Sequence, residues 1–568
     1  MKLCPRRFVS SSGLVAVASL IFAACGGDDA NGTSSGADGG ARGDGATSDG
    51  GPLDDGSVII GDATVPPPPA PVCAAPIQAA DVSHPTTVVG TGAAGSCTEQ
   101  ALVVALAKGG VVTFDCGGKT TIAITSELVL AKGKDVTIDG GGLITLDGGG
   151  KTRLFHFDGG NFRVTKTMVT LQHLTLSGAK SRGTAIPPAP APCSQGFETD
   201  GGGAAVLVRD GLLHVVDVTF VGNAAATPGP DVAGGGVYVI GSLDTTIVGS
   251  RFVGNTASNG GAVGSLFSNL TLANDTFTGN KATGTGANST DNACQAARGN
   301  EVGDGGNGGA VVMDGGEEFA VSICGCVFAN NAGGALGGAV FRTPDINRQK
   351  TTIDRSTFDG NTGKGGGALY FHHSDLTITA TTFSNNSAEG AGAIQADDTT
   401  LDMTNVTLTS NRATKSLGGA VSLFGNGGHL ASCTFADNHA DAGSGIFGAA
   451  IAGNTTFTID NTIFANNTSQ DAGAPMTCQD GSSTGAGNLQ WPRNHLVGGS
   501  PDSACAAGIT FADPKLDALK DNGGPTKTMT PIAGSPAIGI GKACPATDQR
   551  GRPRKQPDGC TAGAVEVP

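Results

Sequence analysis

Apolar and polar residues alternate in short runs along most of this chain. Leu376 and Ile378 alternate with threonines in one such run, and Phe383 follows after a short break. A period of two is typical of a β-strand with one buried face. The repeating part shows no apolar period of 3.6, and the 94 glycines would weaken helices. The pattern therefore predicts an all-β protein.

The runs share one phrase, an aromatic residue followed three positions later by asparagine. The phrase recurs every 25 residues at its closest, as between Phe358 and Phe383. A fixed period of this length is typical of a solenoid, in which one structural unit stacks on copies of itself. The aromatic positions are Phe220, Phe252, Phe277, Phe328, Phe358, Phe383, Phe435 and Phe464, with Leu408 in the seventh unit. The asparagines are Asn223, Asn255, Asn280, Asn331, Asn361, Asn386, Asn411, Asn438 and Asn467.

Each unit is long enough for one turn of a coil. At roughly 3.3 Å per residue, such a unit traces about 80 Å when extended, enough for three short strands and three corners. Coils stacked roughly 4.8 Å apart would pair every strand with its equivalents above and below. We therefore predict a right-handed parallel β-helix from about residue 111 to residue 500. A leucine-rich repeat has a similar period, but its Leu-x-x-Leu-x-Leu framework is missing.

The residues of the phrase suit corners and a core. Asn tolerates the left-handed backbone of a tight corner, and its amide can bond to the equivalent Asn of the next coil. The Phe before it is expected to stack inward. Gly-Gly-Ala, as at Gly366–Ala368, follows in five units and supplies a second corner. These are structural roles, and none of these residues is a catalytic candidate by type.

Residues 96–110 depart from the strand pattern. Ser96 and Glu99 form a capping box, Leu102 and Leu106 form an apolar face, and Gly109 begins a stop signal. A short helix here would cover the open end of the first coil, which otherwise exposes unpaired strand edges. Strands are then expected at 111–114, 121–124, 136–138 and 143–146, with corners at 139–142 and 147–150.

The first 71 residues have the composition of an export signal and a tether. Residues 1–24 carry basic residues and then an apolar run too short to span a membrane. This resembles a lipoprotein signal, in which Cys25 becomes the lipidated first residue; an ordinary secretory signal cut near Ala24 is the alternative. Residues 25–71, rich in Gly, Asp, Ser and Pro, predict a disordered tether. We expect an exported protein, lipid-anchored to the outer membrane or cell surface.

The net charge of the chain limits the classes of partner that it is expected to bind. The formal net charge is −15, and removing the three cations of the signal gives −15 − 3 = −18. So acidic a chain disfavours nucleic acid and anionic lipid as partners. We expect a monomer that meets the membrane through its lipid alone.

The cysteines agree with export. Of the 14 cysteines, 12 remain without Cys4 and Cys25, an even number that favours disulfides in an oxidising compartment. Cys324 and Cys326 could instead hold a metal, but no neighbouring histidines complete a site, so none is predicted. The expected local disulfides are Cys97–Cys116, Cys478–Cys505 and Cys544–Cys560.

The repeats and the chain's end also resemble known families. Phe-x-x-Asn with Gly-Gly-Ala, over roughly residues 85–470, resembles the repeats of polymorphic outer membrane proteins. That resemblance implies a pectin-lyase-like β-helix, a fold shared by adhesins and by enzymes that cleave polysaccharides. Residues 510–568 resemble the choice-of-anchor Q domain, which implies surface anchoring and no enzyme activity. This segment carries the motifs Leu519–Thr526, Gly534–Ile538, Thr547–Arg554 and Gly563–Glu566. The expected organisation is signal 1–24, tether 25–71, capped β-helix 72–509 and C-terminal segment 510–568.

One acidic cluster is the best candidate for catalysis. Asp397 and Asp398 are adjacent, and Asp375 and Asp402 lie at similar positions of neighbouring coils. Polysaccharide cleavage needs paired carboxylates, or a Ca²⁺ site of clustered Asp with an Arg or Lys base. The polygalacturonase motifs Asn-Thr-Asp, Gly-His-Gly and Arg-Ile-Lys and the pectate lyase motif Arg-x-Pro-x-x-Arg are absent. We expect no cofactor, with Ca²⁺ only if this cluster is catalytic.

Three further features are candidates for function or stability. The insertions Gly178–Asp200 and Lys281–Asn307 interrupt the coils, and long loops on a rigid scaffold often carry function. Their cysteines Cys193 and Cys294 could bridge the two loops. In the C-terminal segment, Asp548, Arg550 and Glu566 are expected to form a buried ion-pair lock across the last coil.

Two functions are compatible with these features. The first is a non-enzymatic surface protein with an adhesive, structural or binding role, whose partner would be a polysaccharide or the surface of a host or neighbouring cell. The second is a surface-displayed polysaccharide lyase or glycoside hydrolase acting on an acidic polysaccharide. The scarcity of sugar-stacking rings, one Trp and two Tyr, favours the first.

Overall fold

The computed structural model describes most of one compact unit, Asp55–Pro568. The expected signal peptide, Cys25, nearly all of the tether, Cys193 and Cys294 lie outside the described residues. The described ranges are 58–60, 63–65, 70–185, 197–227, 229–286, 304–315, 319–344, 348–415, 417–441, 447–453, 456–469, 476–479, 483–495 and 499–568.

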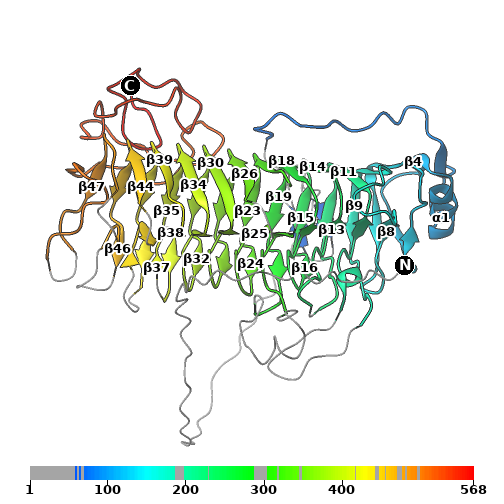
Figure 1. The fold of residues 1–568 in the computed structure, drawn as a ribbon. Coiled ribbons are helices and arrows are strands. Elements are labelled where there is room, and N and C mark those ends of the chain that lie inside the picture. Colours follow the sequence, from blue (N-terminus) through cyan, green and yellow to red (C-terminus); the bar gives the residue numbers. More distant parts are fainter. Residues whose placement is uncertain are drawn as a thin grey trace, which may run out of the picture. The chain divides into compact units, whose positions relative to one another are not determined.

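One coil shows how the alternating pattern folds. The chain runs through β10 (Val206–Arg209), β11 (Leu212–Val216) and β12 (Thr219–Val221), with tight turns between them. Each strand then pairs in parallel with its equivalent one coil later, as β10 does with β13 (Val237–Ile240). The coils stack side by side (Figure 1). The predicted right-handed parallel β-helix is confirmed.

The first strands of the coils form a sheet of 11 strands, called the first sheet here. Its strands are β6 (Leu128–Val129), β8 (Phe155–Asp158), β10, β13, β17 (Val263–Leu266), β21 (Val311–Asp314), β25 (Val340–Thr343), β29 (Leu369–His372), β33 (Ile394–Asp397), β38 (Val421–Phe424) and β43 (Ile451–Gly453).

The second and third strands of the coils form two further parallel runs. The middle strands are β11, β14 (Thr245–Val248), β18 (Leu270–Ala273), β22 (Val321–Cys324), β26 (Gln349–Asp354), β30 (Ser374–Thr379), β34 (Thr400–Thr404), β39 (Gly428–Ala431) and β44 (Phe457–Asp460). The last strands are β12, β15 (Arg251–Val253), β19 (Thr276–Thr278), β23 (Val327–Ala329), β27 (Thr357–Asp359), β31 (Thr382–Ser384), β35 (Thr407–Thr409), β40 (Thr434–Ala436), β45 (Ile463–Ala465), β47 (Leu489–Trp491) and β48 (Thr510–Phe511).

Short elements complete the coils. The first coils use β3 (Thr87–Gly90), β4 (Gly110–Asp115), β5 (Thr120–Ala123), β7 (Val136–Asp147) and β9 (Met168–Ser177), and a 3₁₀ turn spans Thr199–Gly201. Two-residue strands follow the Asn corner: β16 (Thr256–Ala257), β20 (Lys281–Ala282), β24 (Ala332–Gly333), β28 (Thr362–Gly363), β32 (Ser387–Ala388), β36 (Arg412–Ala413), β41 (His439–Ala440) and β46 (Thr468–Ser469). Two separate pairs are β37 (Leu417–Gly418) with β42 (Phe447–Gly448), and the antiparallel β1 (Val58–Ile60) with β2 (Ala63–Val65).

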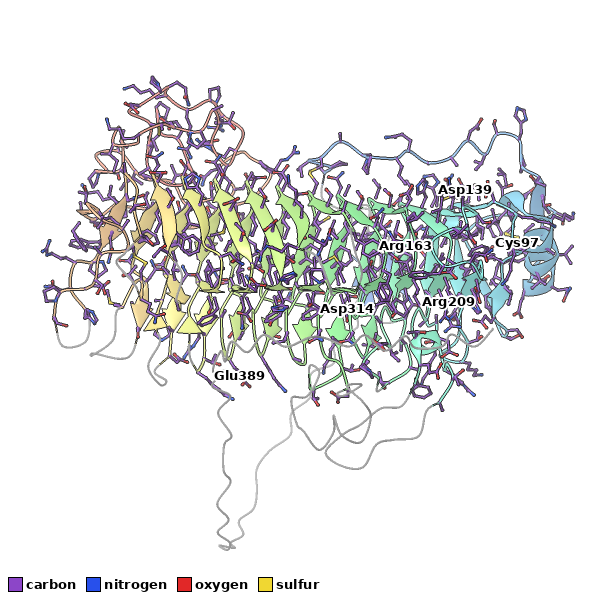
Figure 2. All side chains as sticks on the ribbon, viewed as in Figure 1. Cys97, Asp139, Arg163, Arg209, Asp314 and Glu389 are labelled. Carbon is purple, nitrogen blue, oxygen red and sulfur yellow. A yellow bond between two sulfur atoms is a disulfide. The ribbon has the colours of Figure 1, made fainter. Side chains whose placement is uncertain are left out.

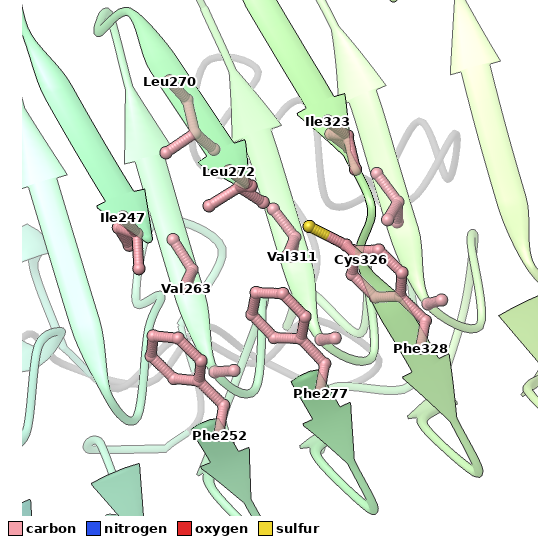
Figure 3. Close-up of a cluster of buried hydrophobic side chains, with 14 of the residues drawn as sticks. Ile247, Phe252, Val263, Leu270, Leu272, Phe277, Val311, Ile323, Cys326 and Phe328 are labelled. Atoms are coloured by element: carbon pink, nitrogen blue, oxygen red, sulfur yellow. The ribbon is translucent and has the colours of Figure 1, made fainter. Parts of the chain in front are cut away.

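The repeated phenylalanines stack inside the coils. The rings of Phe358 and Phe383 lie 4.8 Å apart and nearly parallel, at 7°. The stack runs without a break from Phe220 to Phe383. After Leu408 it resumes between Phe435 and Phe464, and every ring is fully buried. Figure 3 shows three of these rings beside the aliphatic side chains of the other strands.

The repeated asparagines form a buried hydrogen-bond ladder. Asn386 Nδ2 donates to Asn411 Oδ1 at 2.9 Å and to the Phe358 carbonyl at 2.9 Å. Its own Oδ1 accepts from Asn361 Nδ2 and from the Asn361 backbone N–H. Equivalent amide contacts link all nine residues from Asn223 to Asn467. A buried amide is stable here because the neighbouring coils satisfy its polar atoms.

The N-terminal end of the solenoid is closed by α1 (Glu99–Lys108), which buries Leu102, Ala105 and Leu106. Gly109 caps its C-terminus, as predicted. The predicted N-cap was wrong, because Thr98 and not Ser96 accepts from the Ala101 N–H. The capping box fails because the Glu99 carboxylate turns to the next coil, where it accepts from the backbone of Thr125 and Ser126.

One expected corner is also corrected. Residues 139–142 do not end a strand, because β7 continues through them with a shift in register between Asp139 and Ile144. Gly141 and Gly142 have φ values of 58° and 72°, and the Gly141 N–H bonds to Asp139 Oδ1 at 2.6 Å. The chain bends at these glycines without leaving the sheet.

A strap formed by residues 70–86 runs along the turns between middle and last strands. We call this line of turns the strap edge; it includes Asn274, Arg355, Asn405 and Asn461 (Figure 1). Asn274 Oδ1 accepts from the Cys73 N–H at 3.0 Å, and Asn274 Nδ2 donates to the Cys73 carbonyl at 2.9 Å. In Figure 2, Asp139 lies on this edge and Glu389 lies on the opposite one.

The C-terminal segment folds back onto the same edge. Asn405 Nδ2 donates to the Thr547 carbonyl at 2.8 Å, and Asn461 contacts the backbone of Lys542. Both ends of the described chain are therefore held by side-chain amides at equivalent turns of different coils.

Four disulfides cross-link the described part of the chain. Three are the expected local pairs, Cys97–Cys116, Cys478–Cys505 and Cys544–Cys560. The fourth, Cys73–Cys324, fixes the strap to a middle coil across a sequence separation of 251. Cys326 and Cys433 are free and buried. Among the described helices, none is both long and apolar enough to cross a membrane.

Candidate functional site

The four candidate acids do not form one cluster. Asp375 and Asp402 point outward from the middle strands β30 and β34, and Asp397 ends β33 of the first sheet. Asp398 follows in the turn, in a left-handed conformation with φ of 44°. The four acids therefore lie in three separate environments.

Asp375 and Asp398 are joined by Arg348, which lies immediately before β26. Arg348 Nε is 3.2 Å from Asp375 Oδ1, and its Nη1 is 3.0 Å from Asp398 Oδ1. The same guanidinium donates to the carbonyls of Asp398 and Ser374 at 2.7 and 2.8 Å. Arg348 therefore links three coils and forms an ion pair with each of the two carboxylates.

The other neighbours of Asp398 keep it ionised. His373 Nδ1 lies 2.5 Å from Asp398 Oδ2, and Asn426 Nδ2 donates to Oδ1 at 2.6 Å. The His373 hydrogen bond lowers the pKa of Asp398; slight burial opposes this, and Asn426 and Arg348 add to the lowering. A carboxylate held in this state is not suited to act as a general acid near neutral pH.

Asp397 lies on the outer face of the first sheet, beside Tyr370. Its Oδ2 accepts from the Tyr370 hydroxyl at 2.8 Å and from Gln395 Nε2 at 3.1 Å. Its Oδ1 is buried and has no hydrogen-bond partner in the described part of the chain. Burial raises the pKa of Asp397, although Tyr370, Gln395 and His372 pull the other way. Of the four acids, Asp397 comes nearest to the character of a general acid.

The hydroxyl beside Asp397 is a donor and not a base. Burial raises the pKa of Tyr370 far above its ordinary value, and the charge of Asp397 adds to this effect. Tyr370 therefore stays protonated and fixes the orientation of the Asp397 carboxyl.

Asp402 lies in the third environment, apart from Arg348 and from Tyr370. Its Oδ1 accepts from the His429 N–H at 2.9 Å, while the His429 ring lies 3.0 Å from Asp460. Both residues are at the surface of the middle strands. Asp402 thus contributes to neither of the other two groups.

The C-terminal acids are structural. Arg550 Nη2 lies 2.7 Å from Asp548 Oδ2 and donates to the Glu566 carbonyl at 2.7 Å. The Glu566 carboxylate pairs with Arg554 at 3.4 Å, a partner that the sequence analysis did not include. The expected position across the last coil was wrong. The Thr407 hydroxyl donates to Gln549 Oε1 at 2.6 Å, so this segment docks on coils in the middle of the chain.

The two long insertions are closed at their bases by the same contact. Thr184 donates its backbone N–H and its hydroxyl to the Asp200 carboxylate at 2.8 and 2.6 Å. Thr285 does the same to Asp304 at 2.8 and 3.0 Å. The carboxylates of Asp200 and Asp304 therefore already accept the hydrogen bonds that close the two loops.

A cleft of about 650 Å³ lies on the strap edge between the strap and the C-terminal segment. Asp354, Arg355 and Asn405 line it. Arg355 pairs with Asp354 at 2.7 Å, and Asn405 is held by Thr547 and by Arg554. These polar side chains satisfy one another, so the cleft is the seam between two docked segments.

Metal-ligating atoms gather at one place in the described residues. The sulfurs of Cys73 and Cys324 and the Asp354 carboxylate lie within 4.8 Å of one another. The two sulfurs are joined in a disulfide, so they are not available as thiolate ligands. None of the four candidate acids belongs to this group.

One of the comparisons with known proteins, a match to a family model, agrees with the fold. Residues 345–510 match the family model described as a right handed beta helix region. No curated protein matches the chain. A solved structure titled "Geobacillus virus E2 - ORF18" is 13% identical with a TM-score of 0.29, and the match covers 66% of this chain and 61% of that one. A PL6 alginate lyase complex with trisaccharide is 12% identical with a TM-score of 0.37, and the match covers 75% of this chain and 85% of that one. The chain thus spans 61% of the ORF18 chain, and neither likeness assigns a function.

The sequence did not reveal the residues that contact the candidate acids. Arg348 follows a stretch without strand pattern, so nothing in the repeat placed its guanidinium against Asp375 and Asp398. Tyr370 could have been found, because it lies in the same register as Gln395 on the neighbouring strand.

Proposed function

We propose that this protein is exported, anchored by a lipid on Cys25, and acts at the cell surface by binding a partner that it does not cleave. The observation that carries the binding role is that Arg348 forms ion pairs with both Asp375 and Asp398. His373 and Arg348 favour the charged form of the Asp398 carboxyl, whereas an acid–base pair of a glycosidase needs one protonated carboxyl. The partner would be a polysaccharide or the surface of a host or neighbouring cell.

The placement at the surface rests on separate observations. Four disulfides within the described residues suit an oxidising compartment outside the cytoplasm. The lipoprotein-like signal, the polymorphic outer membrane protein-like repeats and the choice-of-anchor Q-like segment would each agree with an anchored surface protein. Cys25→Ser should release the protein from membranes or block its maturation. Unchanged membrane fractionation of this variant would contradict the lipid anchor.

Cleavage of an acidic polysaccharide is the second candidate, and Asp397 favours it. Its carboxyl is half-buried, has a raised pKa and keeps one oxygen without a partner. The deciding experiment incubates residues 55–568 with acidic polysaccharides, with and without Ca²⁺. Binding without new reducing ends or unsaturated uronates supports the binding role. Cleavage that is lost in Asp397→Asn and kept in Asp398→Asn would establish the enzyme instead.

A further inference from the structure

The C-terminal segment contains its own cleft, apart from the candidate acids. Its volume is about 440 Å³, within the range of about 300–1,000 Å³ that is typical of ligand sites. Thr530, Ile538, Arg550, Arg552, Lys555 and Val567 are among the residues that line it.

Two cations of this cleft have no carboxylate partner in the described structure. Lys555 is exposed and makes no hydrogen bond or ion pair there. Arg552 is exposed too, and its guanidinium bonds to a single protein group, the Asn522 carbonyl at 3.2 Å. Most other basic side chains of this segment are paired; Lys520, for example, lies beside Asp517. Two unpaired positive charges therefore face one cleft of a chain whose net charge is −15.

The side chain of a third cation, Arg550, has a fixed orientation. Asp548 holds Arg550 through Nε at 2.9 Å and Nη2 at 2.7 Å. Arg550 Nη1 has no partner within the described residues. A guanidinium held on one side by a carboxylate can still bind an anion with its free side.

The acidic side chain at the cleft already has partners. Glu566 is the one acidic side chain that lines it. Its carboxylate pairs with Arg554 at 3.4 Å and accepts from the Thr561 N–H at 3.0 Å. Pro568 also lines the cleft.

We propose that this cleft binds a carboxylate-bearing oligosaccharide, such as a short stretch of a polyuronate. The three cations would receive the carboxylates, since guanidinium and ammonium groups form charge-assisted hydrogen bonds with them. Ile538, Pro553 and Val567 offer apolar surface to the faces of the sugar rings. This proposal rests on the binding role proposed above, which requires a partner. It adds the chemical class of that partner and the site that binds it.

The test is calorimetric titration of residues 55–568 with trigalacturonate, with neutral maltotriose and inorganic phosphate as comparison ligands. The test variant carries Arg552→Gln and Lys555→Gln, two exposed residues of the cleft. The matched control carries Lys515→Gln and Lys542→Gln, which change the charge equally in the same segment but lie outside the cleft.

We expect trigalacturonate to bind, maltotriose not to bind and added salt to weaken binding. The cleft variant should weaken it by about tenfold, the effect of two surface ion pairs together, and the control by less than about twofold. Equal losses in both variants, no binding by the wild type, or equally tight binding of phosphate would overturn the proposal. Cleavage products in the titration mixture would instead contradict the binding role and leave the cleft's assignment standing.

Discussion

The side-chain amide of Asn461 binds both backbone groups of Lys542. Asn461 Nδ2 donates to the Lys542 carbonyl at 2.7 Å, and the Lys542 N–H donates to Asn461 Oδ1 at 2.7 Å. Gln172 makes the same pair of contacts with Ala80 at 2.8 and 3.1 Å. One carboxamide can replace a neighbouring strand in this way, because it presents one donor and one acceptor in the same plane.

Removing this amide should loosen the C-terminal segment. Asn461 has a φ of 52°, so Asn461→Gly keeps the backbone conformation and removes the buried side chain with its two hydrogen bonds. We expect hydrogen exchange in residues 540–545 to accelerate while the Asn ladder stays protected. Asn385→Gly, at an exposed turn with a φ of 56°, is the control. Equal exchange in both variants would show that the contact does not hold the segment.

The Phe stack should dominate the stability of each coil. Phe383→Ala should lower the free energy of unfolding by roughly 3–5 kcal/mol, because a fully buried ring is replaced by a cavity. Thr377→Ala, on the outer face of β30, should change it by less than about 0.5 kcal/mol. Urea unfolding followed by circular dichroism measures both. A Phe383→Ala midpoint no lower than that of Thr377→Ala would contradict the inward stack.

The ion group at Glu127 should make stability depend on pH. Arg153 Nη1 lies 2.5 Å from Glu127 Oε1, and His156 Nδ1 lies 3.3 Å from the same atom. Burial opposes ionisation, but His156 and Arg153 outweigh it and lower the pKa of Glu127 from 4.5 to about 2. Because the folded pKa is lowered, the stabilisation is complete above about pH 4.5 and is lost as the pH falls toward 2.

Glu127→Gln tests this dependence. The difference in unfolding free energy between wild type and variant should shrink from pH 6 to pH 3. Glu389→Gln, on the opposite edge, should show a smaller and flatter difference. A constant difference for Glu127→Gln over this range would show that the ion group does not titrate as the structure indicates.

The disulfide Cys73–Cys324 should stabilise more than the local one at the N-terminal cap. It closes a sequence separation of 251, against 19 for Cys97–Cys116. Loop entropy grows slowly with length, so its removal should cost about 2 kcal/mol more than removal of the short bond. Thermal unfolding of Cys73→Ser/Cys324→Ser and Cys97→Ser/Cys116→Ser compares them. A larger loss for the short loop would show that native contacts of α1 outweigh chain entropy.

The sequence predicted the coils well because their signals are local. A Phe and an Asn at a fixed offset determine one inward side chain and one corner, and the period places the next copy above them. The same reasoning failed for Asp397 and Asp398. They are adjacent, but the strand ends between them, so one side chain faces Tyr370 and the other enters the turn beside His373.

Contacts between distant segments could not be predicted. Nothing in the residues around Cys73 indicates that Asn274 will receive its backbone, and the even number of cysteines permitted many pairings. Gln549 was part of a recognised motif, yet its partners Thr382 and Thr407 lie in repeats that look like their neighbours. A repeat predicts what all coils share, and docking depends on what distinguishes one coil from the next.

The bond from Cys73 to Cys324 also joins two thiols that emerge far apart in time. A chain synthesised or exported from its amino end presents Cys73 long before its partner, while Cys97 and Cys116 emerge soon after it. Pairing of Cys73 with one of the thiols that precede Cys324 would give a mispaired bond, which must rearrange by thiol–disulfide exchange before the native bond can close. In the folded chain, the closed Cys73–Cys324 bond therefore ties the strap to a coil 251 residues further along the sequence.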